Sequence, residues 1–243
     1  PYRTPTVDAR YVAQRAATRE RCVAIFPRRQ FERQRALITQ GRFQMIHPAK
    51  QFITPEEYLA LEEKADHRSE YWNGEMFAMS GGSVNHNLIA GNVHAGLRQL
   101  LSSRPCRVFI NDVRLHIKSS GLYTYPDVMV ICGKIEFLPG RDDTVLNPVV
   151  IVEVWSDSTK AYDRGEKFSM YRQIPTLQEY VMIDQTKSYV EHYRRDGNFW
   201  VLETLEKADA ILTLPSLECE MPLAVMYEKV EWQEVNNGSE NRT

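Results

Sequence analysis

Apolar residues between positions 54 and 79 follow helical spacing first and strand-like spacing afterwards. Thr54-Pro55-Glu56-Glu57 supplies an N-cap, a proline at the first helical position and a capping-box acid, which predicts a helix from Thr54 to about Ala65. Glu70–Trp72 and Glu75–Met79 flank Asn73-Gly74, the dipeptide that best tolerates the positive φ angles of a tight turn. The pattern therefore predicts a helix followed by a β-hairpin.

Two further helices are predicted from apolar periodicity. The longer one runs from about Ser83 to Ser102, and the second covers about Arg164–Gln173, where Pro175 ends it. The apolar face of the longer helix is predicted to consist of Val84, Leu88, Gly91, Ala95, Leu97, Leu100 and Leu101. We expect this helix to pack on one face of a sheet.

The remaining apolar runs are short or alternate with polar residues, which is typical of strands. The predicted strands are Cys106–Ile110, Val113–Ile117, Pro126–Ile131, Val149–Trp155, Glu179–Ile183, Ser188–Tyr193 and Asn198–Glu203. This order of elements predicts one α/β or α+β domain with a mixed central β-sheet.

Two of these runs each contain one carboxylate in an otherwise apolar, strongly β-forming segment. Asp127 lies in the run Tyr125–Val130, and Glu153 lies in Val149–Trp155. An uncompensated charge in such a run would cost several kcal/mol, so a neighbouring cation or a bound metal ion must compensate it. A second acid at matching depth on an adjacent strand favours a metal, and the pair therefore predicts a divalent-metal site.

The distribution of charge separates the first 44 residues from the rest. The chain has 243 residues and a net charge of −2, but residues 1–44 alone carry +7, from ten arginines and three acids. These residues are interpreted as a disordered arm, an over-extended reading frame or a basic nucleic-acid-binding tail, and residues 45–243 as the domain. The domain is acidic, at −9. That charge argues against a broad footprint on duplex nucleic acid, although a local basic groove can coexist with it.

Cysteine spacing and hydropathy indicate the cellular compartment to expect. Cys22, Cys106, Cys132 and Cys219 contain no C-x-x-C pair, so neither a zinc site nor a disulfide framework is predicted. No run approaches the roughly 18 apolar residues of a membrane helix, and the start of the sequence lacks an apolar signal core. We therefore expect a cytoplasmic protein in a reducing environment.

Lys167 is the candidate for a catalytic cation beside the two acids. Hard divalent cations such as Mg²⁺ bind carboxylate oxygens and assist the hydrolysis of phosphodiester bonds. This reaction usually also needs a positively charged side chain near the scissile phosphate. Asp163 can cap the following helix with Glu166 at its third position, which puts Lys167 in the first turn, where the helix dipole disfavours it. Lys167 then faces the carboxylates, or it is a surface lysine paired with Asp163.

A series of motifs in one order resembles a known family. The matching motifs are Pro126-Asp127, Pro148-Val-Val-Ile-Val-Glu153-Val-Trp-Ser156-Asp-Ser-Thr159, Asp163-x-x-x-Lys167-x-x-x-Tyr171 and Glu179-Tyr180-x-x-Ile183-Asp184, with the upstream hairpin Asn73-Gly74-Glu75-x-x-Ala78-Met79-Ser80 and His86. From about Thr54 to Tyr227 the chain resembles the Uma-two family of putative restriction endonucleases, in the PD-(D/E)XK nuclease superfamily.

The resemblance implies a restriction-endonuclease-like fold and a Mg²⁺- or Mn²⁺-dependent endonuclease that hydrolyses DNA. By position, Asp127 and Glu153 would bind the metal. Position 155, where the superfamily has a lysine on the strand, is Trp, and the resemblance implies that Lys167 replaces it from the following helix. Nucleases of this superfamily often pair as dimers, so a homodimer is possible here.

Two residues are weaker candidates for the same site. Glu75, on the hairpin, is either an additional acidic ligand in the same pocket or a surface carboxylate. His86 either orients a water or phosphate or is a capping or hydrogen-bonding residue near the start of its helix. Two alternative functions stay open. The first is a catalytically inactive nucleic-acid-binding or regulatory module of the same fold. The second is a metal-free hydrolase, such as a glycosidase, in which the two acids act as acid and base.

Overall fold

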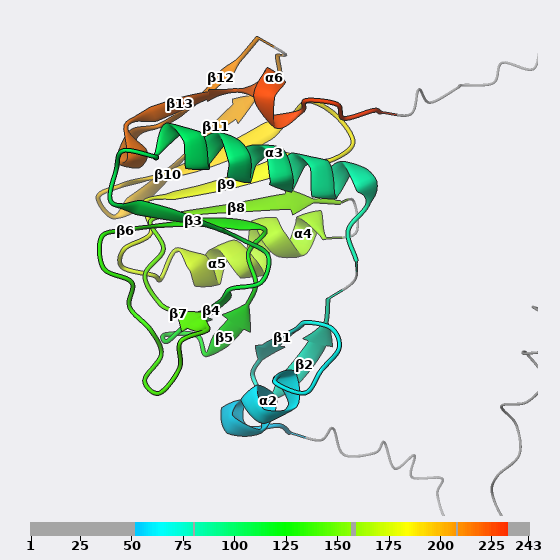
Figure 1. The fold of residues 1–243 in the computed structure, drawn as a ribbon, viewed down its shortest axis with the longest axis vertical. Helices are drawn as coiled ribbons and strands as arrows, with labels where there is room; N and C mark the ends of the chain where they lie inside the picture. The colour runs from blue at the N-terminus through cyan, green and yellow to red at the C-terminus, as the bar shows by residue number, and fades with distance from the viewer. Residues whose placement is uncertain (1–51, 80, 157–158, 208, 233–243) are drawn as a thin grey trace, which may run out of the picture. The chain divides into compact units, whose positions relative to one another are not determined.

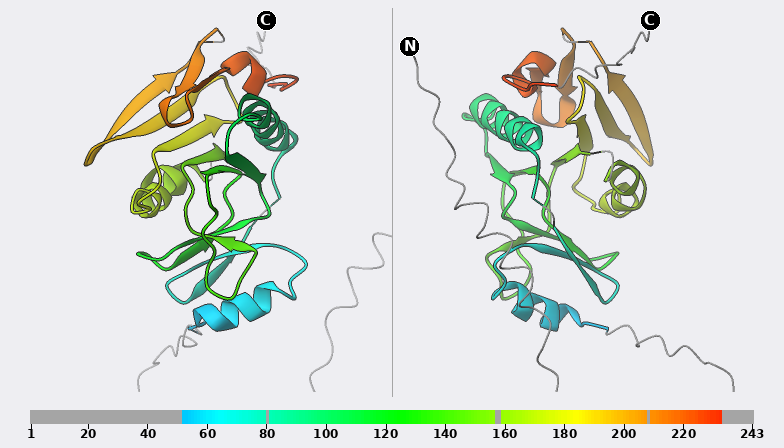
Figure 2. Two further views of the ribbon diagram at one scale, coloured as in Figure 1. Left: turned by 60° about the vertical axis from the view of Figure 1, so that its left-hand side comes forward. Right: turned by 90° about the vertical axis from the view of Figure 1, so that its right-hand side faces the viewer.

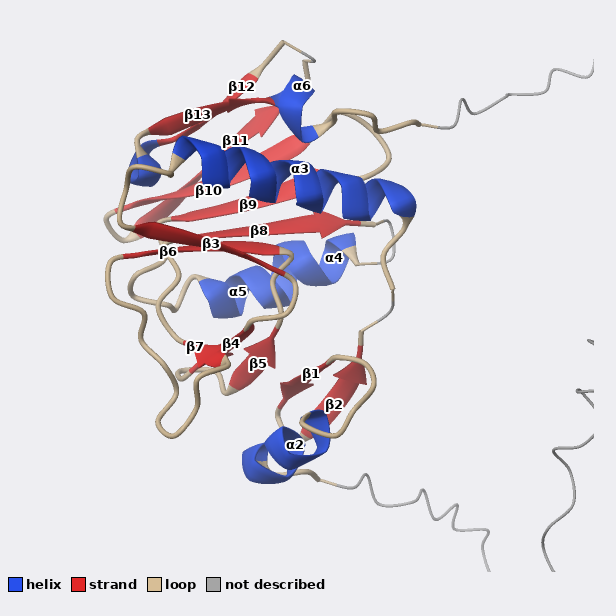
Figure 3. Cartoon of the chain, in the orientation of Figure 1, coloured by secondary structure: helices blue, strands red, loops and turns tan. Residues whose placement is uncertain are grey.

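The computed structural model describes residues 52–79, 81–156, 159–207 and 209–232, all within one unit that spans Lys50–Thr243. The basic arm predicted for residues 1–44 lies outside the described residues. Two larger sheets and a two-stranded sheet form the described part, with helices packed against them (Figure 1, Figure 3). The predicted class, a mixed α and β domain with a mixed sheet, is confirmed.

The larger sheet has six strands in the order β11-β10-β9-β8-β6-β3. Its strands are β3 (Cys106–Ile110), β6 (Val128–Cys132), β8 (Val150–Trp155), β9 (Glu179–Asp184), β10 (Val190–Asp196) and β11 (Phe199–Leu205). Only β8 and β9 pair in parallel, and the other neighbouring strands of this sheet are antiparallel. All six strands were predicted, β3 with both ends correct and the others with ends that differ by at most three residues.

Helices cover both faces of this sheet (Figure 2). On one face lies α3 (Val84–Leu100), which packs on Val128, Val152 and other residues of the sheet. On the other face lies one continuous helical segment, whose residues Met170 and Tyr171 pack near Trp155. That segment consists of α4 (Lys160–Tyr162), η1 (Asp163–Lys167) and α5 (Phe168–Tyr171). Because side chains alternate along a strand, Glu153 points to the same face as Trp155, toward this segment.

The second sheet carries the predicted hairpin. Its five strands lie in the order β2-β1-β5-β4-β7. They are β1 (Ser69–Trp72), β2 (Glu75–Ala78), β4 (Arg114–Ile117), β5 (Leu122–Thr124) and β7 (Thr144–Val145). The helix α2 (Pro55–Glu62) begins with the predicted capping box, in which Thr54 and Glu57 bond each other's backbone N–H groups. The turn has positive φ at Asn73 (50°) and Gly74 (84°), as predicted.

Several short elements were not predicted. Besides β5 and β7, these are β12 (Ile211–Leu214), η2 (Pro215–Leu217), β13 (Cys219–Pro222) and α6 (Leu223–Met226). They add Leu212, Met221 and Met226 to the core on the α3 side of the large sheet. Each element is two to four residues long. Periodicity cannot identify runs of that length.

The predicted apolar face of α3 was partly wrong. The buried residues of the helix are Ile89, Ala90, Val93 and Leu97, whereas Val84 is 76% exposed. Both sets of residues follow helical spacing, so spacing alone does not choose between them. The rotation of the helix against the sheet, a tertiary property, decides which stripe is buried, and here that stripe packs on Val128 and Val152.

The prediction of no disulfide was also wrong, because the structure joins Cys106 and Cys132. The two residues are 26 positions apart in sequence but stand directly opposite each other in the β3–β6 register. Sequence spacing did not reveal this pairing because it depends on strand register.

In the part of the chain that the structure describes, no helix is long and apolar enough to cross a membrane.

Candidate active site

A cavity of about 360 Å³ opens at the carboxyl end of β8. Its wall comes from the hairpin β1–β2, the start of α3, the end of β8 and the segment α4–η1. Among the described residues, the ionisable side chains that line it are Glu70, His86, Tyr125, Asp127, Glu153, Tyr162, Asp163 and Lys167. The structure therefore gathers Asp127, Glu153, Lys167 and His86, four of the five site residues predicted from the sequence, in one cavity.

Strand pairing brings Asp127 and Glu153 together. β6 and β8 are antiparallel with Val128 opposite Val152, so Asp127, just before β6, lies beside the end of β8. The backbone N–H of Val154 donates to Oδ2 of Asp127 at 2.7 Å, and the N–H of Asp127 donates to Oε2 of Glu153 at 3.3 Å. Both carboxyl groups are buried. The two acids thus meet on neighbouring strands.

Lys167 reaches the acids from the helix that follows β8. Its Nζ lies 2.9 Å from Oε1 of Glu153, 2.9 Å from Oε1 of Glu70 and 3.8 Å from Oδ1 of Asp163. The Tyr171 hydroxyl also donates to Oε1 of Glu153, at 2.7 Å. Lys167 is only 6% exposed, so it is not a surface lysine, although the proposed pairing with Asp163 is present.

The helix around Lys167 differs from the prediction. It begins at Lys160, so Asp163 does not cap it and Lys167 does not lie in its first turn. Asp163–Lys167 forms a π-helical turn in which both of these end residues are buried. Turns of this kind are rare, and they occur frequently at functional sites. Here the π-helical turn places an acid and a lysine on the cavity wall.

The hairpin supplies Glu70 to the cavity, not Glu75. Among the described residues that line the cavity, Glu70 is present and Glu75 is absent. In the hairpin register Glu70 stands opposite Phe77, whereas Glu75 stands opposite Trp72, next to the turn. The two acids share a face of the hairpin, since Glu70 and Trp72 are two residues apart. The alternation of side chains along the hairpin therefore could have identified Glu70 as a second candidate for the acid that reaches the cavity.

Glu70 is held as an ionised acid. Thr124 Oγ1 donates to its Oε1 at 2.5 Å, and the Tyr162 hydroxyl donates to its Oε2 at 3.4 Å. Burial alone would raise the pKa of Glu70, but the charge of Lys167 and the hydrogen bond from Thr124 outweigh it and lower the pKa. Glu70 therefore remains a permanent counter-charge to Lys167.

His86 lies in the first turn of α3 and contacts Asp127. Its Nε2 is 2.9 Å from Oδ1 of Asp127. Burial opposes the charged form of His86, but the hydrogen bond and charge of Asp127 outweigh burial, so the pKa of His86 is raised above its usual value. The backbone N–H of His86 donates to the N-cap Ser83. His86 thus caps nothing with its side chain and faces the acid.

Crowding of carboxylates shifts the proton affinity of the site. Burial raises the pKa of Glu153 to about 7, with Lys167 opposing this shift and Asp127 adding to it. Burial also raises the pKa of Asp163. Desolvation would lower the pKa of Lys167, but its acidic neighbours, Glu153 foremost, raise it well above the usual range. Among the described residues that line the cavity, four carboxyl groups thus share it with one permanent cation, Lys167.

This excess of negative charge fits a hard divalent cation. Within the described ranges, no group of three or more His, Cys, Asp or Glu side chains is placed to hold a metal ion. Mg²⁺, however, usually keeps several waters and takes only one or two protein carboxylates. Asp127 and Glu153 offer that pair of oxygen ligands, and a bound cation would relieve the repulsion between them.

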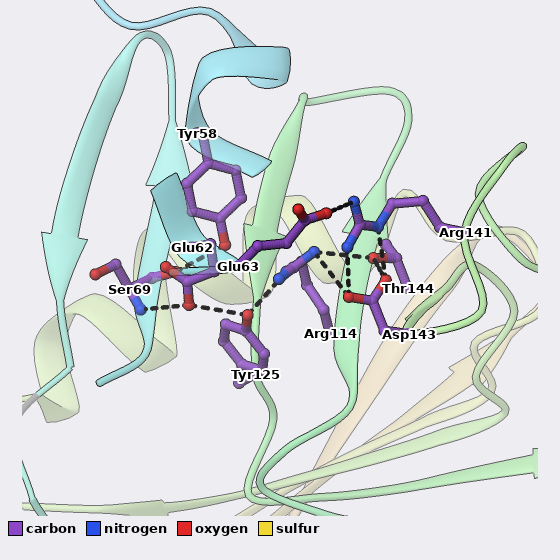
Figure 4. Close-up of polar contacts among 9 residues, drawn as sticks. All are labelled: Tyr58, Glu62, Glu63, Ser69, Arg114, Tyr125, Arg141, Asp143 and Thr144. Atoms are coloured by element: carbon purple, nitrogen blue, oxygen red, sulfur yellow. Dashed lines mark hydrogen bonds and ion pairs between the residues drawn. The ribbon is translucent and has the colours of Figure 1, made fainter. Parts of the chain in front are cut away.

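A polar network behind the cavity supports two of its acids (Figure 4). Glu62 Oε1 accepts from the backbone N–H of Ser69 at 2.9 Å and from the Tyr125 hydroxyl at 2.9 Å. Arg114 Nε donates to the same hydroxyl at 2.8 Å. Ser69 directly precedes Glu70, and Tyr125 stands two residues before Asp127. The network therefore ties together the segments that carry Glu70 and Asp127.

The same network continues to the far edge of the five-stranded sheet (Figure 4). Arg114 Nη1 donates to Thr144 Oγ1 at 3.2 Å and lies 3.5 Å from Oδ2 of Asp143. Arg141 binds Asp143 and Glu63, each at 2.7 Å. The residues of this network come from separate parts of the sequence, and no local pattern predicted them.

Comparison with known proteins identifies the relatives of this chain. A family model named Uma2 and described as "Putative restriction endonuclease" matches residues 55–226. One uncharacterized protein of Synechocystis sp. is 40% identical over 162 residues, which cover 66% of this chain and 92% of the relative. A second uncharacterized protein of the same organism is 34% identical over 178 residues, covering 72% of this chain and 91% of the relative.

A solved structure shares the fold. The crystal structure of a putative nuclease belonging to DUF820 from Anabaena variabilis superposes with a TM-score of 0.59 and 19% sequence identity. The similarity covers 72% of this chain and 97% of that one. At this identity the similarity establishes the fold alone.

Proposed function

Because the chain belongs to the Uma2 family of putative restriction endonucleases, we propose that it is a metal-dependent endonuclease that hydrolyses DNA phosphodiester bonds. The observation that carries this proposal is the meeting of Asp127, Glu153 and Lys167 in one cavity, with Lys167 Nζ 2.9 Å from Glu153. The acids come from neighbouring strands and the amine from the next helix. A structural ion pair alone would not require the additional acids that surround it.

In the proposed site, Asp127 and Glu153 would hold Mg²⁺ or Mn²⁺. When bound, such a cation neutralises charge on a phosphoryl oxygen and makes water more acidic. Oδ2 of Asp127 is oriented by the N–H of Val154, so the acid needs little rearrangement on binding.

Lys167 supplies a fixed positive charge beside the scissile phosphate. Glu70 and Glu153 hold its Nζ from two sides at 2.9 Å, which keeps the ammonium protonated and positioned. Preorganised positive charge of this kind stabilises the negative charge that develops on the phosphate in the transition state. Glu70 is thus a positioning residue for Lys167, a role that the sequence analysis assigned to no residue.

His86 is proposed to act on the other side of Asp127. Its raised pKa favours the protonated ring, which donates to Oδ1 of Asp127. A protonated histidine at the cavity wall can donate a second hydrogen bond to a phosphate oxygen or to the leaving group. His86 would therefore orient both the acid and the substrate.

Cleavage of supercoiled plasmid tests the proposed function. The full chain with Mg²⁺ or Mn²⁺ should convert the plasmid to nicked or linear forms, and a chelator should stop the reaction. Asp127→Asn and Glu153→Gln should each abolish cleavage, whereas Glu75→Gln, a matched change outside the cavity lining, should retain it. Metal-dependent cleavage that survives both substitutions at the cavity would exclude this site.

One observation favours the alternative of a non-cleaving, nucleic-acid-binding module. Each carboxylate oxygen of Asp127 and Glu153 already has a protein partner: His86, Val154, Asp127 N–H, or Tyr171 with Lys167. A bound cation must share these oxygens, which have further lone pairs. If the chain is such a module, the wild type should bind nucleic acid but cleave none with any divalent metal. The plasmid assay therefore distinguishes the two functions.

A further inference from the structure

Two lysines lie close to one tyrosine ring, that of Tyr189. Lys160 Nζ lies 5.1 Å from the centroid of the Trp155 ring and 6.0 Å from that of Tyr189. Lys187 Nζ lies 4.8 Å from the same Tyr189 ring. Within the described residues, neither ammonium group forms an ion pair with a carboxylate. Two positive charges, neither paired with a carboxylate of the described residues, therefore lie close to the Tyr189 ring.

The aromatic surface is rigid. The Tyr189 hydroxyl donates to Oε1 of Glu191 at 3.0 Å, and its backbone exchanges hydrogen bonds with the Tyr227 hydroxyl at 3.1 and 2.9 Å. Glu191 is only 2% exposed and also binds Arg164 through Nε at 3.0 Å. The charge of Arg164 is thereby neutralised, and Lys160 and Lys187 are the cations near these rings that have no carboxylate partner among the described residues.

The turn that carries Lys187 is fixed as well. Asp184, which ends β9 and is 3% exposed, accepts from the backbone N–H of Thr186 at 2.8 Å and from its hydroxyl at 2.6 Å. This turn is stabilised by its own side chains. Cation–aromatic contact holds each ammonium in place but leaves its N–H donors available to another ligand.

Both lysines adjoin residues of the cavity wall. Thr159 and Gln185 line the cavity; Lys160 directly follows Thr159, and Lys187 stands two residues beyond Gln185. The interior of the cavity is acidic and the whole chain has a net charge of −2. A polyanion therefore needs local positive charge beside the cavity in order to approach it.

We propose that Lys160 and Lys187 form a subsite for backbone phosphate of the nucleic acid, next to the phosphate that is cleaved. This inference rests on the proposed function, since it assigns the flanking part of the same substrate. The lysines contact phosphate oxygens and carry no sequence information. They account for how an acidic chain can hold a polyanionic substrate with its reactive phosphate at the carboxylates.

The salt dependence of binding tests the subsite. The full chain is titrated with a fluorescent DNA duplex in EDTA, without divalent metal, from about 50 to 200 mM salt, where each phosphate contact contributes about 0.9 to the slope of log K against log salt. The double variant Lys160→Ala/Lys187→Ala should bind more weakly, with a slope smaller by at least about 0.9. The double variant Lys160→Arg/Lys187→Arg should restore the slope. Lys64→Ala/Lys118→Ala, which removes two exposed lysines away from the cavity lining, should leave the slope unchanged.

Cleavage kinetics separate this subsite from the catalytic centre. With Mg²⁺, Lys160→Ala/Lys187→Ala should raise KM and leave kcat near the wild-type value, because the catalytic acids are intact. An unchanged salt slope and KM in this variant would overturn the subsite while wild-type cleavage still upheld the nuclease. Wild-type chain that neither binds nor cleaves DNA would overturn both.

Discussion

Lys167 Nζ lies 2.9 Å from Oε1 of Glu153, and both side chains are buried. Strand β8 ends between them, and the helix that follows returns the lysine to the face of the sheet on which the acid lies. In this arrangement the cation comes from the helix. Trp155 occupies the position on β8 where the resemblance would place a lysine, and it packs in the core. We therefore expect the Lys167–Glu153 pair to matter both for the proposed catalysis and for the stability of the fold.

Removing the amine should destabilise the protein. Lys167→Met leaves Glu70 and Glu153 buried without their shared cation, and breaking a buried ion pair from one side typically costs about 3–5 kcal/mol. The triple variant that adds Glu70→Gln and Glu153→Gln should recover part of this loss, because the two carboxylates closest to the missing ammonium no longer carry charge. Urea unfolding measures both effects. A Lys167→Met chain as stable as wild type would show that the pair does not form.

Tyr125 should be important through its hydroxyl group alone. Tyr125→Phe removes the acceptor of Arg114 Nε and the donor to Glu62, so two buried polar groups lose a partner, at about 1–3 kcal/mol for each group left unsatisfied. Tyr123→Phe, on the neighbouring strand β5, is the matched control and should have little effect because its hydroxyl takes no part in this network. Equal unfolding free energies for the two variants would contradict the network in Figure 4.

Titration of Glu153 should make stability depend on pH. The pKa of Glu153 in the folded chain is about 7, above its ordinary 4.5, because of burial foremost. The folded state therefore binds this proton more tightly than the unfolded state, and the resulting stabilisation is present below about pH 4.5 and lost as the pH rises through about 7.

The comparison variant is Glu153→Gln, whose side chain does not titrate. In metal-free buffer, the free energy of unfolding of wild type should fall relative to that of Glu153→Gln between these two pH values. Parallel profiles for the two proteins would mean that Glu153 has an ordinary pKa.

The secondary structure around the site could be predicted from local patterns, but which side chains reach the cavity could not. The capping box at Thr54, the Asn73-Gly74 turn and the apolar runs around Asp127 and Glu153 are short-range signals, and the elements they predicted are present. Glu70 was missed because it shares a face with Glu75, and only the register of the second sheet shows which one reaches Lys167.

The helix at Lys167 shows a second limit of local signals. Asp163 followed by Glu166 reads as a capping box, yet the chain continues the helix back to Lys160 and accommodates Asp163 in a π-helical turn. Tertiary contacts of the buried Asp163 and Lys167 outweigh the local capping preference. Likewise the pairing of Cys106 with Cys132 depends on strand register, which no sequence spacing encodes.

The disulfide can be checked by peptide mapping. If Cys106 and Cys132 are joined, as in the structure, neither should react with an alkylating reagent until the protein is reduced. Cys219, which is a free thiol, is the internal control and should be alkylated without reduction once the chain is unfolded. Alkylation of Cys106 and Cys132 in unreduced, unfolded protein would show that the two thiols are not joined.

Calorimetric titration with Mn²⁺ tests the central claim most directly, because it asks whether Asp127 and Glu153 hold one divalent cation between them. The wild-type chain should bind one ion per chain at neutral pH. Asp127→Asn and Glu153→Gln should each lose that binding, and Glu75→Gln should retain it. Binding with unchanged affinity in both cavity variants, or no binding to the wild-type chain, would contradict the proposed metal site.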